Sequence, residues 1–210
     1  MRLLLPSNKS GFTLVEVLVI VFVLSFLSIT ALGGYFNSNI TLDFLSNFKE
    51  FRTLLRSPRS YAINNKVVDG TIPPSYGIYI GEVDEDTGLQ EVVVFADNGD
   101  VQQAYDDAES DFPDTVMPSG SLTIDTNFYE LEVFDSTNSP LEFPVTLFYE
   151  SSTADFSAFY DGAIYLPKST QRYLAFEFVS VRDPDLFKYL VIFQVAGLSE
   201  ESNSLPNTGE

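Results

Sequence analysis

The chain has 210 residues, of which 45% are hydrophobic and 20% charged, enough length and apolar content for an ordinary folded domain. It contains no Cys and no His, which excludes disulfides, thiol nucleophiles, Cys/His zinc sites and histidine-based acid–base catalysis. The formal net charge is −19, and residues 67–167 hold 21 Asp and Glu but no Lys or Arg. Such a charge distribution repels nucleic acid and anionic lipid and keeps a protein soluble.

A long apolar segment dominates the N-terminal part of the chain. It is uncharged from Val17 to Leu42, and these 26 residues would form a helix about 39 Å long, which exceeds the roughly 30 Å hydrocarbon core of a bilayer. The segment therefore predicts one membrane span. The alternative is an ordinary cleaved secretory signal, with Arg2 and Lys9 as its charged start and cleavage near residues 31–34. The apolar stretch of such a signal is shorter, about 7–15 residues.

Glu16 lies next to the start of this uncharged segment. A carboxylate in an apolar segment costs up to about 2.5–3.5 kcal/mol at mid-membrane and less near the membrane edge, so such a residue is a functional candidate. The alternative is an acidic residue without a special role, whose side chain reaches the lipid headgroups.

The run KSGFTLVE at residues 9–16 combines Gly, an aromatic residue, a spaced Glu and an apolar continuation. It resembles the processing site of type IV prepilins and pseudopilins, a class III export signal. The resemblance implies a short basic leader that prepilin peptidase removes after Gly11, and N-methylation of the new terminal residue, Phe12. It also implies that Glu16, the fifth mature residue, neutralises the α-ammonium of a neighbouring subunit and so fixes one axial register.

The same resemblance implies where the chain lies and what it contacts. The expected location is the bacterial cytoplasmic membrane, crossed once with the C-terminal domain exported, and afterwards an extracellular or periplasmic filament. The expected partners are prepilin peptidase, other pilin or pseudopilin subunits, and the pilus or secretion assembly platform. Basic residues do not establish this orientation, because Arg2 and Lys9 precede the span and five further Lys and Arg follow it within residues 43–66.

Helical periodicity continues beyond the apolar segment. An apolar stripe with intervals of three and four residues is formed by Phe44, Phe48, Phe51 and Leu55. The basic residues Lys49, Arg52 and Arg56 lie off this stripe. The sequence therefore predicts one long helix whose first half is in the membrane and whose second half packs on a sheet. Pro58 is expected to kink or end this helix, and the glycine pair at residues 33–34 is expected to weaken it.

From about residue 75 the composition favours strands. The expected strands are Tyr76–Ile80, Glu91–Phe95, Ser121–Ile124, Tyr129–Phe134, Val145–Tyr149, Ala163–Leu166, Tyr173–Val181 and Lys188–Val195. Residues 84–88 have turn composition and predict a hairpin between the first two strands. The expected fold class is therefore α+β, with a long N-terminal α-helix packed on a C-terminal antiparallel β-sheet domain, as in pilins. Residues 59–67 resemble the corresponding stretch of GspH- and FimT-like pseudopilins.

These features divide the chain into five expected segments. They are a prepilin leader at residues 1–11, a transmembrane and filament-core helix at 12–42, its amphipathic continuation at 43–66, a β-rich exported domain at 67–200 and a polar C-terminal tail at 201–210.

Residues 97–120 are acidic, contain two prolines and are expected to form an exposed loop. Calcium is the cation that such oxygen-rich loops bind, and Asp97, Asp100 and Asp106 are weak candidate ligands, although their spacing does not fit an EF-hand. The alternative is a solvated loop without a metal, and no other cofactor is expected. Paired carboxylates could also suggest a glycosidase, but in a chain with 30 Asp and Glu such pairs arise from composition, so no enzymatic activity is expected.

The end of the chain contains a second short motif. Residues 205–209 match the LPxTG pattern that sortases cleave, which resembles a cell-wall attachment signal. That signal also needs a hydrophobic stretch and a basic tail after the motif. The expectation here is a polar terminus with a chance match.

Together these patterns predict a structural subunit, a minor pilin or pseudopilin, of a type IV pilus or a type II secretion-like filament. Two alternatives remain: a membrane-anchored surface-binding module that does not polymerise, and an exported enzyme with a cleaved signal peptide. FimT-like pseudopilins include members linked to DNA uptake. No nucleic-acid partner is expected here, because residues 67–167 carry no positive charge to neutralise phosphates.

Overall fold

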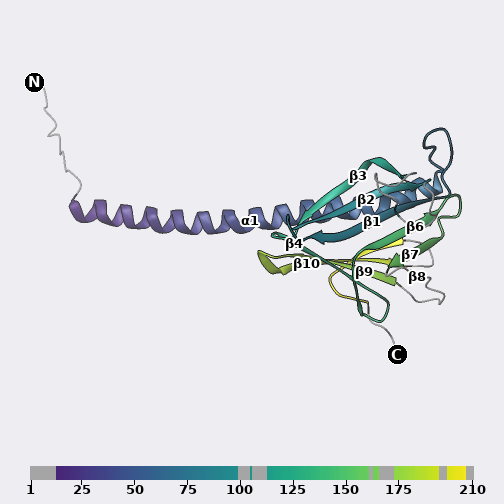
Figure 1. Cartoon of the computed structure of the whole chain (residues 1–210). Coiled ribbons are helices and arrows are strands. Elements are labelled where there is room, and N and C mark those ends of the chain that lie inside the picture. Colours follow the sequence, from purple (N-terminus) through teal and green to yellow (C-terminus); the bar gives the residue numbers. More distant parts are fainter. Residues whose placement is uncertain are drawn as a thin grey trace, which may run out of the picture. The chain divides into compact units, whose positions relative to one another are not determined.

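The computed structural model describes residues 13–98, 105, 113–160, 163–165, 173–193 and 198–206. By its internal contacts the chain divides into two compact units, Met1–Leu42 and Asp43–Glu210. One helix, α1 (Leu14–Ile63), contributes to both units, and the described strands belong to the second unit (Figure 1). The expected α+β class, with a long N-terminal helix and antiparallel sheets, is confirmed.

Helix α1 continues through both of its expected weak points. It runs through residues 33–34 without a break, and it also contains Pro58, so the helix does not end at Pro58 but goes on to Ile63. Pro58 cannot donate a hydrogen bond to the carbonyl of Leu54. The hydroxyl of Ser57 donates to that carbonyl at 2.8 Å instead, so the acceptor left by the proline is satisfied.

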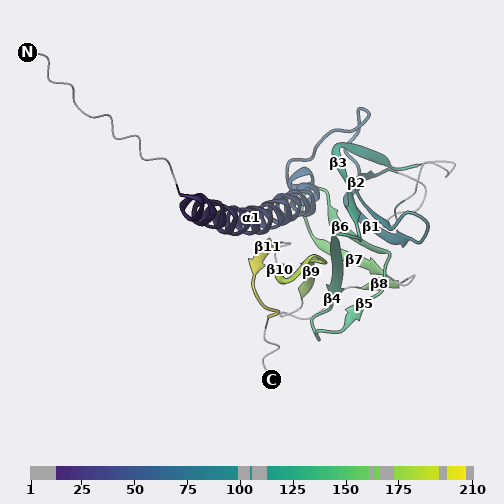
Figure 2. The ribbon, with the colours of Figure 1, turned by 90° about the vertical axis from the view of Figure 1, so that its left-hand side faces the viewer.

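The second unit contains two antiparallel sheets (Figure 2). The six-stranded sheet has the order β3-β2-β1-β6-β7-β8. Its strands are β1 (Ser75–Asp84), β2 (Leu89–Asp97), β3 (Thr115–Asp125), β6 (Val145–Glu150), β7 (Phe156–Tyr160) and β8 (Ala163–Tyr165). The five-stranded sheet has the order β11-β10-β9-β4-β5. Its strands are β4 (Tyr129–Phe134), β5 (Pro140–Leu141), β9 (Tyr173–Ser180), β10 (Asp183–Phe193) and β11 (Leu198–Ser202).

Each expected strand coincides with an observed one, and the predicted hairpin between β1 and β2 is confirmed. Leu166 and Val195, the last residues of two expected strands, lie outside the described residues. Three strands, β5, β7 and β11, were not expected. They are two to five residues long, and β11 is largely polar, so local composition carries little signal and pairing with a neighbour defines them.

The second half of α1 and one face of each sheet enclose the larger of the two apolar clusters among the described residues. The predicted stripe on α1 is confirmed, because Phe44, Phe48, Phe51 and Leu55 are all buried. The six-stranded sheet contributes, among others, Tyr76, Ile78, Val92, Val94 and Leu147. The five-stranded sheet contributes, among others, Leu131, Val133, Phe176, Phe178 and Leu190. Period-two alternation in these strands places their apolar side chains on the helix side of each sheet.

The acidic segment at residues 97–120 is not one exposed loop, which corrects that expectation. Asp97 ends β2, pairs with Ser75 of β1 and is only 1% exposed. Residues 115–120 form the first part of β3. Between them, the backbone N–H of Asn98 donates to the carboxylate of Asp114 at 3.0 Å, which joins the two strand ends.

Candidate functional site

The first turn of α1 contains Glu16, the residue predicted from the sequence to act in subunit assembly. Gly11 and Phe12, the predicted cleavage and methylation positions, lie outside the described residues. Thr13 precedes the helix, and its carbonyl accepts a hydrogen bond from the N–H of Val17 at 3.2 Å. Its side-chain Oγ1 accepts one from the N–H of Glu16 at 3.3 Å. Thr13 is therefore the N-cap of α1.

Glu16 occupies the third position of this helix, where a negative charge is favoured. The unpaired N–H groups of the first turn carry partial positive charge, so a carboxylate there stabilises the helix end. The spacing of Thr13 and Glu16 is that of a capping box, S/T-x-x-E, and this sequence signal would have identified the N-cap that the motif analysis missed. The Glu16 side chain can thus stabilise the N-terminal end of its own helix, and its carboxylate could also pair with a cation from another chain.

The residues after Glu16 are suited to an apolar environment. By length and composition, the helical stretch Leu14–Leu32 is long enough and apolar enough to cross a membrane. It contains three hydroxyl side chains, and each donates within the helix: Ser25 to Val21 and Ser28 to Leu24, both at 2.8 Å, and Thr30 to Leu27 at 3.0 Å. Because these donors are satisfied internally, they need neither water nor a partner in lipid. Glu16 is the only charged residue of this stretch.

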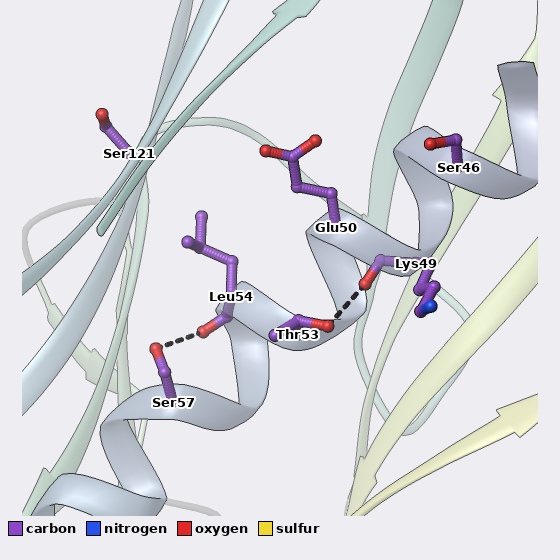
Figure 3. A pocket seen from close by; sticks show the side chains of 7 residues that line it. All are labelled: Ser46, Lys49, Glu50, Thr53, Leu54, Ser57 and Ser121. Carbon is purple, nitrogen blue, oxygen red and sulfur yellow. Dashed lines mark hydrogen bonds between the residues drawn. The ribbon is translucent and has the colours of Figure 1, made fainter. Parts of the chain in front are cut away.

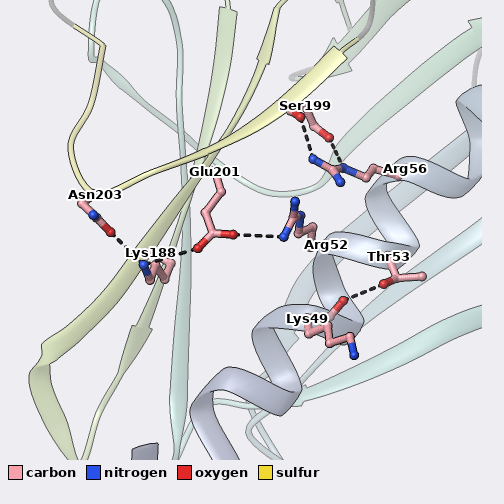
Figure 4. A network of polar contacts seen from close by, with 8 residues as sticks. All are labelled: Lys49, Arg52, Thr53, Arg56, Lys188, Ser199, Glu201 and Asn203. Carbon is pink, nitrogen blue, oxygen red and sulfur yellow. Dashed lines mark hydrogen bonds and ion pairs between the residues drawn. The ribbon is translucent and has the colours of Figure 1, made fainter.

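In the second unit, a polar network joins α1 to β10 and β11 (Figure 4). The guanidinium of Arg52 donates to the carboxylate of Glu201 at 3.0 Å, and the ammonium of Lys188 lies 3.3 Å from the other oxygen of that carboxylate. Arg56 donates to the hydroxyl of Ser199 at 2.6 Å and to its carbonyl at 2.7 Å. Partial burial and the neighbouring Arg52 lower the pKa of Arg56. Two cations therefore share one carboxylate, while the third bonds to neutral oxygens.

A groove of about 340 Å³ runs along the same helical segment (Figure 3). Its lining residues are Ser46, Lys49, Glu50, Thr53, Leu54, Ser57 and Ser121. Most of these are small and hydroxyl-bearing, and the hydroxyls of Thr53 and Ser57 donate to carbonyls of α1 itself. The lining therefore lacks the set of convergent polar groups that a small-molecule site needs.

The candidate calcium ligands are not brought together by the described residues. Asp97 is buried, and its carboxylate accepts a hydrogen bond from the hydroxyl of Ser75. Asp100 and Asp106 lie outside the described residues. Within the described part of the chain, no three Asp or Glu side chains are grouped in a way that could hold a metal ion.

The outer face of the five-stranded sheet carries a pair of like charges that the sequence reading did not identify. Glu132 of β4 and Glu177 of β9 are direct cross-strand partners. Partial burial, then Glu130 and Glu177, raise the pKa of Glu132. The hydroxyl of Tyr189 donates to the carboxylate of Glu177 at 2.8 Å, and burial together with this carboxylate raises the pKa of Tyr189 to about 12. Alternation of Leu131 and Val133 with acids was visible in the sequence, but the cross-strand pairing was not.

The start of the LPxTG-like motif lies on the same outer face. Leu205 packs against a small apolar cluster that contains Tyr173, Ala175 and Val191. The hydroxyl of Tyr173 donates toward the carbonyl of Pro206 at 3.1 Å. The remaining motif positions, 207–209, lie outside the described residues.

Comparison with known proteins identifies the N-terminal segment. Residues 6–32 match the family model described as the prokaryotic N-terminal methylation motif. The match includes Gly11, Phe12 and Glu16, and it is consistent with a class III signal of the type IV pilin kind. Such a motif implies processing by prepilin peptidase and assembly with pilin subunits. No curated protein and no solved structure matches this chain.

Proposed function

We propose that this protein is a structural subunit, a minor pilin or pseudopilin, of a type IV pilus or a type II secretion-like filament. The observation that carries the proposal is the N-terminal methylation motif at residues 6–32, whose later part overlaps the helical stretch Leu14–Leu32. In this role the first unit anchors the precursor in the cytoplasmic membrane and later packs with the helices of other subunits. The second unit is the exported domain.

The chemistry of Glu16 supports this role. It is the only charge in an otherwise apolar stretch, where an unpaired carboxylate is costly. Cleavage after Gly11 would create an α-ammonium at Phe12, and pairing that cation with Glu16 of a neighbouring subunit offsets the cost of burying either charge. Because the pair forms at one axial offset between two helices, it also defines their register.

A non-catalytic role is part of the proposal. The composition supports it, because a chain without His or Cys has no imidazole base and no thiol nucleophile. The soluble unit instead provides a folded, strongly acidic surface for display on a filament.

Mass spectrometry of the mature N-terminus tests the proposal. We expect a chain that begins at N-methylated Phe12 when the protein is made in cells with a prepilin peptidase. Gly11→Leu should leave the precursor in the membrane, uncut and unmethylated. A wild-type chain with an intact Met1 would point to an anchored module that does not polymerise, and a start near residue 33 would point to a secreted protein.

A further inference from the structure

The last described residues of the chain leave β11 and fold back over the outer face of the five-stranded sheet. The hydroxyl of Ser202 donates to the carbonyl of Ser204 at 2.7 Å and accepts from its N–H at 3.2 Å, a tight turn that redirects the chain. Leu205 and Pro206 then reach the small apolar cluster on that face. Residues 203–206 are named the C-terminal strap. The outer cluster is defined as Tyr173, Ala175 and Val191.

The outer cluster is separate from the main core. Its residues alternate along β9 and β10 with four side chains of the main core, Leu174, Phe176, Leu190 and Ile192. The three members of the outer cluster are 6%, 0% and 1% exposed although they lie on the outer side of the sheet. Three half-buried side chains pack on them, namely Phe134, Tyr189 and Leu205. Of these three, only Leu205 comes from outside the sheet, so the strap supplies the part of the cover that can move away.

The polar contact at the end of the strap is replaceable. The hydroxyl of Tyr173 lies 3.1 Å from the carbonyl oxygen of Pro206 and 2.7 Å from the side-chain oxygen of Asn138. A hydroxyl has one proton to donate, so the shorter bond to Asn138 keeps this group satisfied when Pro206 departs. An unsatisfied buried donor would make opening costly, and here none is created.

The start of the strap is attached in the same replaceable way. The ammonium of Lys188 donates to the side-chain oxygen of Asn203 at 2.8 Å and lies 3.3 Å from the carboxylate of Glu201 (Figure 4). Asn203 is exposed, so water can take its place while the contact with Glu201 persists. β11 itself pairs with β10 from Leu198 to Ser202, ahead of the strap. Release of the strap therefore leaves the strand order of the sheet unchanged.

We propose that the C-terminal strap is a releasable cover whose opening exposes the outer cluster while the rest of the second unit stays folded. In the closed state Leu205 occupies the cluster, and in the open state the cluster joins the already exposed Phe193 in one apolar patch. Such local opening requires less free energy than global unfolding, because it disrupts only half-buried apolar contacts and replaceable hydrogen bonds. The proposal gives Leu205 and Pro206 of the LPxTG-like match a role in the fold, and it does not depend on filament assembly.

The reaction rate of a thiol beneath the strap measures this opening in the full-length protein. The chain has no Cys, so Val191→Cys places a single thiol in the outer cluster. Ala158→Cys places one in the main core, where Ala158 is 2% exposed, and reports global unfolding. In detergent-solubilised protein treated with a charged, water-soluble thiol reagent, Leu205→Asp should raise the labelling rate at position 191 at least roughly ten-fold. The rate at position 158 should not change.

Two further substitutions control for the nature of the change at position 205. Leu205→Met keeps an apolar side chain of similar size, and Ser204→Ala alters an exposed residue of the strap, so both should label at position 191 like the wild type. Equal rates at position 191 with and without Leu205→Asp would show that the strap does not cover the cluster. Equal acceleration at positions 191 and 158 would show that the strap does not open on its own. Neither result affects the mass of the mature N-terminus, which tests the proposed function separately.

Discussion

The ring of Phe51 on α1 stacks on the ring of Phe178 on β9, with centroids 5.7 Å apart and planes inclined by 21°. The ring centroid of Phe178 also lies 5.7 Å from that of Phe44, 6.2 Å from that of Phe48 and 5.3 Å from that of Tyr129. One side chain of the five-stranded sheet thus contacts three aromatic residues of the helix. This cluster fixes the second half of α1 to the sheets of the second unit.

Replacing Phe178 should therefore cost much of the stability of the second unit. In a soluble fragment of residues 43–210, Phe178→Ala should lower the free energy of unfolding by about 3–5 kcal/mol, because it removes buried ring contacts and leaves a cavity. Phe187→Ala is the control, since Phe187 is 37% exposed on β10, and it should cost about 1 kcal/mol or less. Urea unfolding followed by circular dichroism measures both. Equal losses would show that the aromatic cluster is not the main attachment of the helix.

The carboxylate of Glu201 should hold β11 in place, because Arg52 of α1 and Lys188 of β10 both pair with it. Glu201→Gln should increase amide hydrogen exchange in β11 several-fold, an effect of about 0.5–1 kcal/mol for a half-exposed network. Glu200→Gln is the matched control, since no described cation pairs with that residue. If both variants exchange like the wild type, the backbone pairing of β10 and β11 alone keeps the strand in place.

Glu132 should make the second unit less stable as the pH rises from acid to neutral. Its pKa in the folded protein is raised, first by burial and then by Glu130 and Glu177, so the ionised form is disfavoured in the fold. The stability contributed by its neutral form is fully present below the unfolded pKa of about 4.5 and is lost as the pH rises through the raised folded value.

Glu132→Gln should therefore stabilise the unit by roughly 0.2–1 kcal/mol at pH 7 and have little effect at pH 4. The exposed Glu142→Gln serves as the control and should show neither change. Unfolding midpoints measured between pH 4 and pH 8 provide the test. A stabilisation of equal size at both ends of this range would mean that removal of charge is not its cause.

Charge and capping at Glu16 can be separated by two substitutions. Glu16→Gln keeps a side chain that can complete a capping box but removes the charge, and Glu16→Ala removes both. If pairing with an α-ammonium is what matters, both variants should insert and be cleaved normally but enter filaments at least ten-fold less than the wild type, since an unpaired buried cation remains. Thr13→Ala, which loses only a cap worth about 1 kcal/mol, should have a smaller effect. Normal incorporation of Glu16→Gln would show that charge pairing is not required.

The second unit should not bind DNA at physiological salt. Its described cations are largely engaged: Lys66 lies over the ring of Tyr61 and Arg182 over that of Phe128, while Arg52 shares Glu201 with another cation. At 150 mM salt we expect no binding tighter than the non-specific range of about 10⁻⁴ M in a fluorescence anisotropy titration with duplex DNA. A micromolar, salt-dependent affinity that Arg52→Ala or Arg182→Ala weakens would make DNA uptake the leading role.

The sequence by itself determined the features that depend on local pattern. The motif at residues 9–16, the apolar run and the stripe on α1 are periodic or contiguous, and the strands with alternating apolar residues follow the same logic. The class of fold and the choice of Glu16 as the candidate assembly residue follow from these patterns without any knowledge of distant contacts.

Tertiary structure decided what depends on partners far apart in the chain. Pro58 stays inside the helix because Ser57 satisfies the carbonyl that the proline leaves without a donor, a side-chain bond that composition does not reveal. The polar strand β11 exists because it pairs with β10 and because Glu201 meets Arg52 from 149 residues away. In the same way, Glu132 and Glu177 became neighbours only through the register of β4 and β9. Long-range pairing is set by the packing of the whole domain, and a local window of sequence contains no record of it.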